Sequence, residues 1–293
     1  EYMEAAQQVE EAVHIAHEHR LVMPLLWTVW ISGLVCIGKG EYDAALMKLE
    51  QHLAFSEKVG AEVISLRVLN TLGWLWIEFD NHTRALDMNN RSADGARKRG
   101  DPETFANANI NLADLLLAQG KLPEAQEVTE ETYRMVKHPA TSDWMRWRYS
   151  THLFSTMGDL SLVCGNPAKA REWADQCLEI ATRTDSTKNL AKGWRLRGEV
   201  ALAERRWDDS LHALQQAMTF ARRTGNPTQI WKTHVALGRW NEARRRPDAA
   251  YSAYVEARKV LDGISNRLHD ERLRTSFDTS PSIQQIYKLS APR

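Results

Sequence analysis

Three histidines, His14, His17 and His19, cluster near the start of the chain and are candidates for holding a metal ion. His14 and His17 share one face of a helix, but no carboxylate or cysteine completes the set at the spacing of a zinc site. A solvated helix surface explains them better. Phosphate-binding (GxxxxGK[ST]), nucleophile (GxSxG), metalloprotease (HExxH) and calcium-loop motifs are absent. We therefore predict no enzyme activity, no metal site and no cofactor.

The composition narrows the class of partner and the compartment. The 38 basic and 38 acidic side chains cancel and form no basic block, so neither nucleic acid nor an anionic membrane is favoured as a partner. The cysteines, Cys36, Cys164 and Cys177, show no CxxC spacing. We interpret them as small buried thiols in a reducing compartment, which predicts a cytoplasmic protein.

One apolar run, LVMPLLWTVWISGLVCI at residues 21–37, has to be weighed as a membrane span. It is at the short limit for a span and contains Pro24, Thr28 and Gly33. A buried helix is the favoured interpretation and a membrane span the alternative. A charged helix precedes the run, so we predict no signal peptide. Because the chain begins at Glu1 inside a repeat, we expect it to be a piece of a longer protein.

A repeat with a period of 40 residues organises the chain. Small residues recur at two phases of this period, with a single step of 45. The first phase holds Gly33, Gly73, Ala113, Gly158, Gly198 and Gly238, and the second holds Ala5, Ala45, Ala85, Ala125, Ala170, Ser210 and Ala250. This periodicity is typical of a helical-repeat array, which we count as one continuous all-α domain.

Each period predicts two helices, because apolar residues recur at spacings of three and four between glycines and prolines. The small residues lie where the two helices must approach closely, and a larger side chain would push them apart. A short tail leaves the period and predicts two helices that cover the last exposed layer. The predicted organisation is a half repeat at 1–19, hairpins at 21–59, 61–99, 101–137, 142–183, 185–224 and 226–267, and capping helices at 268–293.

The pattern resembles the tetratricopeptide repeat family over residues 1–267. The residues that carry it are Trp194, Gly198, Ser210 and Ala217, then Thr71-Leu72-Gly73, Trp76 and Ala85, and the turn Gly40-Glu41-Tyr42-Asp43-Ala44-Ala45. The resemblance implies a right-handed superhelical solenoid of antiparallel helix hairpins. The period exceeds the family's usual 34 residues, and such long repeats are similar to the arms of bacterial signalling ATPases, transcription activators and adenylate cyclases.

The resemblance also implies where a partner binds. In the family, the first helix of each hairpin lines a concave groove at offsets of −6, −3 and +1 from the small residue. Those positions are Trp27, Trp30 and Leu34; Arg67, Asn70 and Trp74; Asn107, Ile110 and Asp114; His152, Ser155 and Asp159; Lys192, Arg195 and Glu199; and Lys232, Val235 and Arg239. The groove would be aromatic near its start, acidic in the middle and basic toward its end. The family's chaperone-type carboxylate clamp is not matched.

We therefore predict a protein- or peptide-binding scaffold, the regulatory arm of a larger multidomain signalling protein. Asparagine and arginine suit a peptide backbone and carboxylates, because both donate hydrogen bonds in pairs. The predicted contacts are Trp30, Arg67, Asn70, Trp74, Asn107, Asp114, Asp159, Lys192, Arg195 and Arg239. One alternative is a small-ligand or signalling-peptide sensor that switches an upstream output domain, with tryptophans forming its pocket. Another is a self-assembly module.

The step of 45 residues places an insertion at 138–142, before a helix that carries Trp144 and Trp147. Two interpretations remain open for this pair. The favoured one packs both tryptophans on the previous hairpin, since large aromatic side chains are usually buried. The other makes them an exposed aromatic and cationic lip for a partner, because tryptophan and arginine often anchor interfaces.

Overall fold

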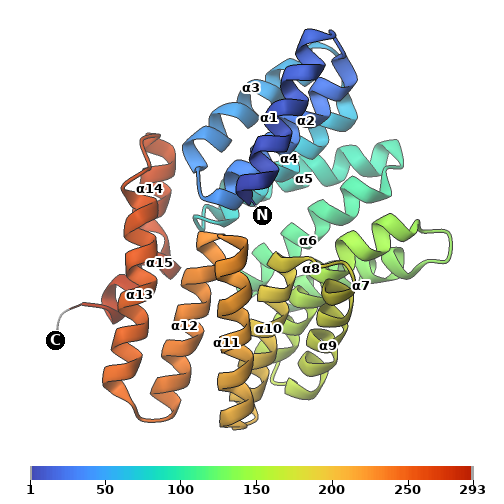
Figure 1. Cartoon of the computed structure of the whole chain (residues 1–293). Coiled ribbons are helices and arrows are strands. Elements are labelled where there is room, and N and C mark those ends of the chain that lie inside the picture. Colours follow the sequence, from blue (N-terminus) through green and yellow to red (C-terminus); the bar gives the residue numbers. More distant parts are fainter. Residues whose placement is uncertain (1, 292–293) are drawn as a thin grey trace. The chain divides into compact units, whose positions relative to one another are not determined.

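The computed structural model describes residues 2–291, which form fifteen α-helices and no β-strand (Figure 1). The predicted all-α class is confirmed. The helices are α1 (Tyr2–Glu18), α2 (Val22–Lys39), α3 (Tyr42–Lys58), α4 (Glu62–Ile77), α5 (His82–Arg99), α6 (Pro102–Ala118), α7 (Leu122–Lys137), α8 (Asp143–Val163), α9 (Pro167–Arg183), α10 (Thr187–Ala203), α11 (Trp207–Thr224), α12 (Pro227–Ala243), α13 (Pro247–Ser265), α14 (Glu271–Thr279) and α15 (Pro281–Leu289).

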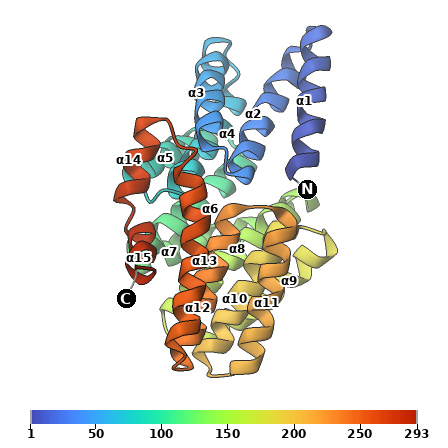
Figure 2. The ribbon, with the colours of Figure 1, turned by 60° about the vertical axis from the view of Figure 1, so that its left-hand side comes forward.

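Consecutive helices pack as antiparallel pairs, and neighbouring pairs within each of the two compact units described below pack on one another (Figures 1 and 2). Within a pair, α2 packs on α3, α4 on α5, α8 on α9 and α10 on α11. First helices also contact one another, α2 with α4, and α10 with both α8 and α12. The predicted groove positions lie on these first helices and on α6.

The helix ends follow from local chemistry. Gly100 and Gly225 end α5 and α11 with φ of 67° and 73°, a left-handed conformation that glycine adopts without a steric penalty. Asn166 and Asn226 precede prolines, and their side-chain oxygens accept hydrogen bonds of 3.0 and 2.9 Å from backbone N–H groups in the first turns of α9 and α12. These caps set where each helix of a pair begins and ends.

The chain divides into two compact units. Unit 1 comprises Glu1–Asn111 and Ile264–Ser280, and unit 2 comprises Leu112–Gly263 and Pro281–Arg293. The boundary at residue 111 falls inside α6, and the tail contributes α14 to unit 1 and α15 to unit 2. That the array behaves as one continuous domain stays a prediction.

The apolar run at the start of the chain is a core helix of unit 1. Among the described residues, one helix, α2, is long and apolar enough to cross a membrane. It packs against α1, α3 and α4, and its side chains Leu26, Val35 and Ile37 are buried between them. This is the packing expected of the buried helix favoured by the sequence.

An aromatic stack lies at the centre of unit 2. The ring of Phe154 on α8, which is 1% exposed, lies 5.3 Å from that of Trp173 on α9 with the planes 28° apart. Tyr133 of α7 meets Trp173 edge-on at 5.5 Å. Offset and edge-on geometries are the favoured ones for aromatic rings. The stack therefore joins two successive hairpins through three helices.

Trp144 lies at the surface, as in the lip interpretation. It is 47% exposed, its ring meets that of the half-buried Trp147 edge-on at 4.8 Å, and the guanidinium of Arg148 lies 5.2 Å from its centroid. Met145 and Tyr149 of the same helix are buried instead. Of the two interpretations left open by the sequence, the favoured one places Trp144 in the core, whereas the structure exposes its side chain.

The glycines of the first phase lie at close helix contacts, as predicted, although the contacting residue differs. Gly33, Gly73, Gly198 and Gly238 face residues 16 positions later on the paired helix, namely Leu49, Asn89, Leu214 and Tyr254. These residues lie one turn beyond the second small phase. Gly158 faces Leu196 of the next hairpin instead. At the second phase, the hydroxyl of Ser210 donates a 2.8 Å hydrogen bond to the carbonyl of Gly198 on the paired helix.

Alanine at two helical glycines should have opposite effects. A Cβ at Gly198 would lie 2.7 Å from the side chain of Leu214 and 3.3 Å from its backbone nitrogen, whereas a Cβ at Gly263 would have no neighbour within 4 Å. Gly263→Ala should therefore stabilise the protein by about 1 kcal/mol through helix propensity, and Gly198→Ala should gain nothing or lose stability through overpacking. Urea unfolding checks this. Equal stabilisation by both would contradict the close contact at Gly198.

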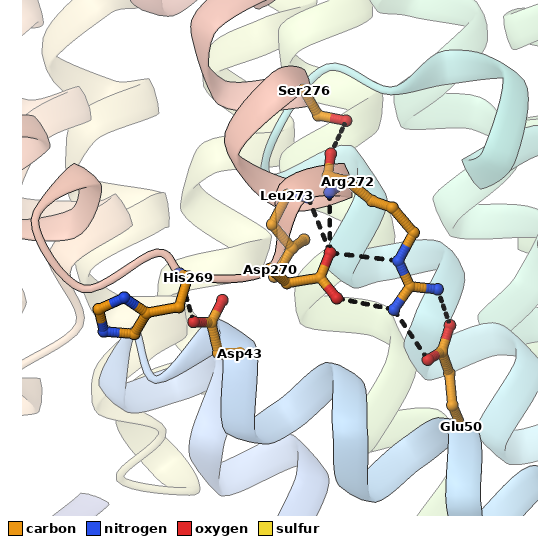
Figure 3. A network of polar contacts seen from close by, with 7 residues as sticks. All are labelled: Asp43, Glu50, His269, Asp270, Arg272, Leu273 and Ser276. Carbon is orange, nitrogen blue, oxygen red and sulfur yellow. Dashed lines mark hydrogen bonds and ion pairs between the residues drawn. The ribbon is translucent and has the colours of Figure 1, made fainter.

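The tail returns to unit 1, where it docks on α3 (Figure 3). The guanidinium of Arg272 forms two hydrogen bonds, of 2.7 and 3.0 Å, with the carboxylate of Glu50 and two more with Asp270. The backbone N–H of His269 donates to Asp43 at 2.6 Å. Paired hydrogen bonds between arginine and carboxylates fix orientation as well as distance.

This docking corrects the predicted role of the tail. Phe277 of α14 is buried against Phe79, and the hydroxyl of Ser280 donates to Asp80 at 2.7 Å, so α14 covers α3 and the turn before α5 rather than the last layer of the array. The other tail helix, α15, packs on the last hairpin, where the hydroxyl of Tyr287 donates to Asp262 at 2.6 Å.

Candidate functional site

Arg67, a predicted groove residue of unit 1, is held inside the protein. It is 7% exposed, forms a 3.0 Å ion pair with Glu103, and its guanidinium lies 5.1 and 5.6 Å from the ring centroids of Trp27 and Trp30. The buried Trp30 donates from its ring nitrogen to the hydroxyl of Thr71 at 2.8 Å. A buried arginine usually stacks on aromatic rings and forms an ion pair. Arg67 and Trp30 therefore join α2, α4 and α6 internally.

A buried asparagine network uses a second group of predicted contacts. Asn89, 0% exposed, accepts hydrogen bonds of 3.1 Å from both Asn70 and Asn111 and donates to the carbonyl of Ala85 at 2.8 Å. Asn107 donates in turn to Asn70, which is 2% exposed. Buried amides need such partners, because an unpaired one costs stability.

The predicted unit 1 contacts thus separate into two groups. Trp30, Arg67 and Asn70 are buried and have internal partners, as described above. Trp74 and Asn107 are half-buried, and the ring nitrogen of Trp74 donates to Glu78 at 2.9 Å. Asn89 and Asn111, the other members of the network, lie outside the family's groove positions, so the sequence pattern did not single them out.

In unit 2 the charged residues at the predicted positions of the first helices are partly exposed, whereas Ser155 and Val235 are buried. Equivalent residues follow one another by 40 positions from α8 to α10 to α12, which are neighbours in the structure. The rows are His152, Lys192 and Lys232; Ser155, Arg195 and Val235; and Asp159, Glu199 and Arg239. We call these nine residues, together with Asp114 of α6, the inner face of unit 2. It is acidic toward α6 and α8 and mainly basic toward α10 and α12.

Asp114 anchors the acidic end. Its carboxylate lies 2.8 Å from Nε2 of His152 and accepts a 2.6 Å hydrogen bond from the hydroxyl of Thr156. Burial by itself would raise the pKa of Asp114, but the hydrogen bond and charge of His152, with further help from Lys192, hold that pKa well below its usual range. Asp114 is therefore ionised at neutral pH.

Asp159 behaves in the opposite way. Burial, reinforced by the carboxylate of Glu199, raises the pKa of Asp159 to about 7, although Arg195 and Lys192 act against the shift. Near neutral pH a single proton thus changes the charge of the middle of the inner face. An acid with a shifted pKa on an accessible surface is typical of functional sites, though not restricted to them.

Asp159→Asn should change the pH dependence of stability. The folded protein keeps the Asp159 proton up to about pH 7, whereas the unfolded chain releases it near the ordinary value of 3.8. The stability that this group contributes is therefore present below about pH 4 and is lost as the pH rises to about 7. We expect Asp159→Asn to be more stable than the wild type by about 1 to 3 kcal/mol at pH 8 and equally stable at pH 4.

Urea unfolding at the two pH values measures this difference, with Asp175→Asn on the exposed side of α9 as the matched control. The control should show no such pH-dependent gain, because Asp175 is exposed. A gain for Asp159→Asn that is the same at both pH values, or a loss at pH 8, would contradict the assigned environment of Asp159.

The basic end is oriented by residues that the sequence pattern did not single out. The guanidinium of Arg195 donates to the side-chain oxygen of the buried Gln229 at 2.7 Å. Lys232 lies over the ring of Trp231, with 5.5 Å from its nitrogen to the centroid. Arg239 and Glu199 are 4.0 Å apart, a long ion pair that leaves Arg239 largely exposed. Gln229 and Trp231 are not at groove offsets, and no local signal marks them.

The cysteines are the remaining candidates for chemistry. Cys36 and Cys177 are buried as predicted, but Cys164 is exposed, because it follows the last residue of α8 at the helix end. Burial raises the pKa of Cys177 to about 12, which keeps this thiol protonated and unreactive. Within residues 2–291, no group of three or more histidine, cysteine, aspartate or glutamate side chains is arranged to hold a metal ion.

No family model matches the sequence, and no curated protein matches it. Solved structures do match its fold. A Rap protein in complex with Competence and Sporulation Factor is 11% identical and superposes with a TM-score of 0.63, over 90% of this chain and 75% of that one. The apo form of the quorum sensor NprR from B. thuringiensis is 14% identical, with a TM-score of 0.58 over 99% and 83%.

A signal-transduction ATPase with a tetratricopeptide repeat sensor, from Pyrococcus horikoshii, is 13% identical with a TM-score of 0.51, and the match spans 83% of this chain but 38% of that protein. At these identities the likeness concerns the fold. The stacked helix pairs, the small residues at their contacts and these structural matches agree. The chain has the fold of the tetratricopeptide-like helical-repeat proteins.

Proposed function

We propose that the chain is a protein- or peptide-binding helical-repeat module and that the inner face of unit 2 is its binding surface. The observation that carries this proposal is the contrast between the two units. Of the predicted contacts of unit 1, Trp30, Arg67 and Asn70 are buried with internal partners, and the half-buried Trp74 and Asn107 carry no charge. Those of unit 2 are partly exposed and carry opposite charges at its two ends. Asp114, Asp159, Lys192, Arg195 and Arg239 are the proposed contacts.

The charge distribution suits an extended peptide better than a compact small molecule. The rows of the inner face repeat from α8 to α10 to α12, so a chain lying across these helices meets a new set of side chains at each one. Lys192 and Arg195 lie in the middle of the face and influence Asp159 electrostatically. Electrostatic complementarity of this kind contributes mainly to specificity and to the rate of association.

The structural neighbours also support a binding role. One is a Rap protein complexed with Competence and Sporulation Factor, another is a quorum sensor, and a third contains a tetratricopeptide repeat sensor. A regulatory arm of a larger signalling protein is the form of the proposal that we favour. A sensor arm that switches an attached output domain is the second form.

The binding test starts from peptides selected on the intact protein from a random display library and measured by fluorescence anisotropy. Lys192→Ala/Arg195→Ala should lower the affinity of selected peptides tenfold or more, since hydrogen bonds to charged groups are worth about 1.5 to 3 kcal/mol each. The matched control, Arg183→Ala/Arg222→Ala, removes two exposed arginines from the second helices α9 and α11 and should leave affinity unchanged. Equal affinity for both double variants would overturn the proposed surface.

Small-angle scattering separates the two forms of the proposal. A sensor arm requires two states with different affinity for the ligand, so a selected peptide should change the radius of gyration of the chain. A passive scaffold should bind the same peptide with no such change. A change that also occurs in the Lys192→Ala/Arg195→Ala variant at equal peptide concentration would contradict binding at the inner face.

A further inference from the structure

A cavity at the basic end of the inner face includes a wall that does not belong to the repeats. Its volume is about 210 Å³. Arg195 and Glu199 of α10 line one side, and α12 contributes Trp231, Lys232, Val235 and Arg239. The tail helix α15 supplies the remaining wall through Ser282, Gln285 and Ile286. The cavity therefore lies at one end of the inner face, between α10, α12 and α15.

The charges of the lining side chains do not balance. Arg195, Lys232 and Arg239 bring three positive charges, and Glu199 is the one carboxylate among the lining residues. Arg239 is 4.0 Å from Glu199, Arg195 also faces Asp159, and Lys232 rests on the ring of Trp231. Because the whole chain carries no net charge, this excess is a local feature of the cavity. An anionic group is its natural complement.

The cavity also has an apolar floor and an arginine that is held in a fixed orientation. Trp231, Val235 and Ile286 are buried and form an apolar floor. Arg195 is held by its 2.7 Å hydrogen bond to Gln229, so its guanidinium loses little freedom when it binds an anion. A planar guanidinium with fixed orientation matches a carboxylate, which can accept two hydrogen bonds from it.

We infer that this cavity holds a carboxylate of the bound peptide, together with an adjacent aliphatic side chain, and that α15 is part of the binding site. The inference rests on the proposed peptide-binding function and names the class of ligand. Two sources share this chemistry, the side chain of an aspartate or glutamate and the carboxyl terminus of the peptide. The ligand is an acidic peptide in either case, and α15 selects it by forming the wall that the repeats lack.

The test uses two fluorescein-labelled hexapeptide libraries, one with a free carboxyl terminus and one with a terminal amide. Enrichment of aspartate or glutamate in the amide library assigns the cavity to a side-chain carboxylate. Binding only by free-acid peptides assigns it to the chain terminus. Either result supports the inference, and the affinity of the selected peptides should also fall as salt is raised. Equal binding by amidated peptides that lack acidic residues overturns it.

Gln285→Glu tests the contribution of α15 with a nearly isosteric change. Gln285 is exposed and lines the cavity. The new carboxylate should therefore pair with the cationic side chains of the cavity and repel the carboxylate of the ligand. We expect acidic peptides to bind about tenfold or more weakly. Gln284→Glu, on the same helix but outside the cavity lining, is the matched control and should leave affinity unchanged. Equal affinity in the two variants overturns the role of α15.

A third variant separates this inference from the proposed function. Lys232→Gln/Arg239→Gln removes charge from the cavity and leaves Lys192 and Arg195 in place. If the affinity of selected peptides requires Lys192 and Arg195 but requires neither Lys232 and Arg239 nor an acidic group in the peptide, the inner face remains the binding surface and the cavity inference is wrong. If peptide binding is insensitive to Lys192 and Arg195 as well, the proposed function itself fails.

Discussion

Phe154→Ala is expected to lower the free energy of unfolding by about 3 to 5 kcal/mol. Phe154 is buried, stacks on Trp173 at 5.3 Å and lies 6.2 Å from the ring of Tyr133. Removing its ring leaves a cavity between α7, α8 and α9, and the two remaining aromatic side chains are too large to close it by small shifts. Urea denaturation followed by circular dichroism measures the loss.

The matched control for this variant is Phe55→Ala. Phe55 is an exposed aromatic side chain on α3, so the same deletion removes little buried surface there. Its effect should stay within about 0.5 kcal/mol. A loss at Phe154 no larger than that at Phe55 would show that the aromatic stack does not hold the two hairpins of unit 2 together.

Asn89→Ala is expected to cost about 2 to 4 kcal/mol, although it removes only a few atoms. The change leaves the amide group of Asn70 without its side-chain acceptor and leaves Asn111 with only a 3.3 Å bond to the carbonyl of Asn70. The carbonyl of Ala85 also loses a side-chain donor. Each buried polar group that loses its partner costs about 1 to 3 kcal/mol, and the losses within one network do not add in full. The neighbouring Asn90→Ala is the control, because Asn90 is exposed.

Asn89→Ala and Phe154→Ala together also test whether the array unfolds as one domain. Asn89 belongs to unit 1 and Phe154 to unit 2. If the predicted continuous domain is correct, both variants shift one and the same unfolding transition. Two transitions, one moved by Asn89→Ala and the other by Phe154→Ala, would mean that the two units unfold independently, and a single free energy of unfolding would then be undefined.

The helices could be predicted because their signals are local and repeated. Small residues recur every 40 positions, and the asparagine–proline pairs and glycines that cap helices are read from a few neighbouring residues. Four of the first-phase glycines meet a side chain 16 positions later, a contact that the repeat itself dictates. The fold class followed from these signals, since a helix pair cannot bury its apolar faces without stacking on the next.

The candidate site could be predicted only in part, because position within the repeat does not determine exposure. Asn70 and Arg195 occupy the same phase. Asn70 is buried among other asparagines, whereas Arg195 lines an open cavity, and the difference comes from neighbours on other helices. The docking of the tail could not be predicted either, since Arg272 and Glu50 are 222 residues apart in sequence and no short pattern connects them.

Photo-cross-linking tests the central claim, that the inner face of unit 2 binds a peptide, most directly. A peptide selected on the intact protein, resynthesised with benzoylphenylalanine at successive positions, would be irradiated in complex and its attachment sites mapped by mass spectrometry. We predict attachment to α8, α10 and α12, and to α15 when the label is next to an acidic residue. Attachment confined to the second helices α9, α11 and α13, or to the helices of unit 1, would contradict the claim.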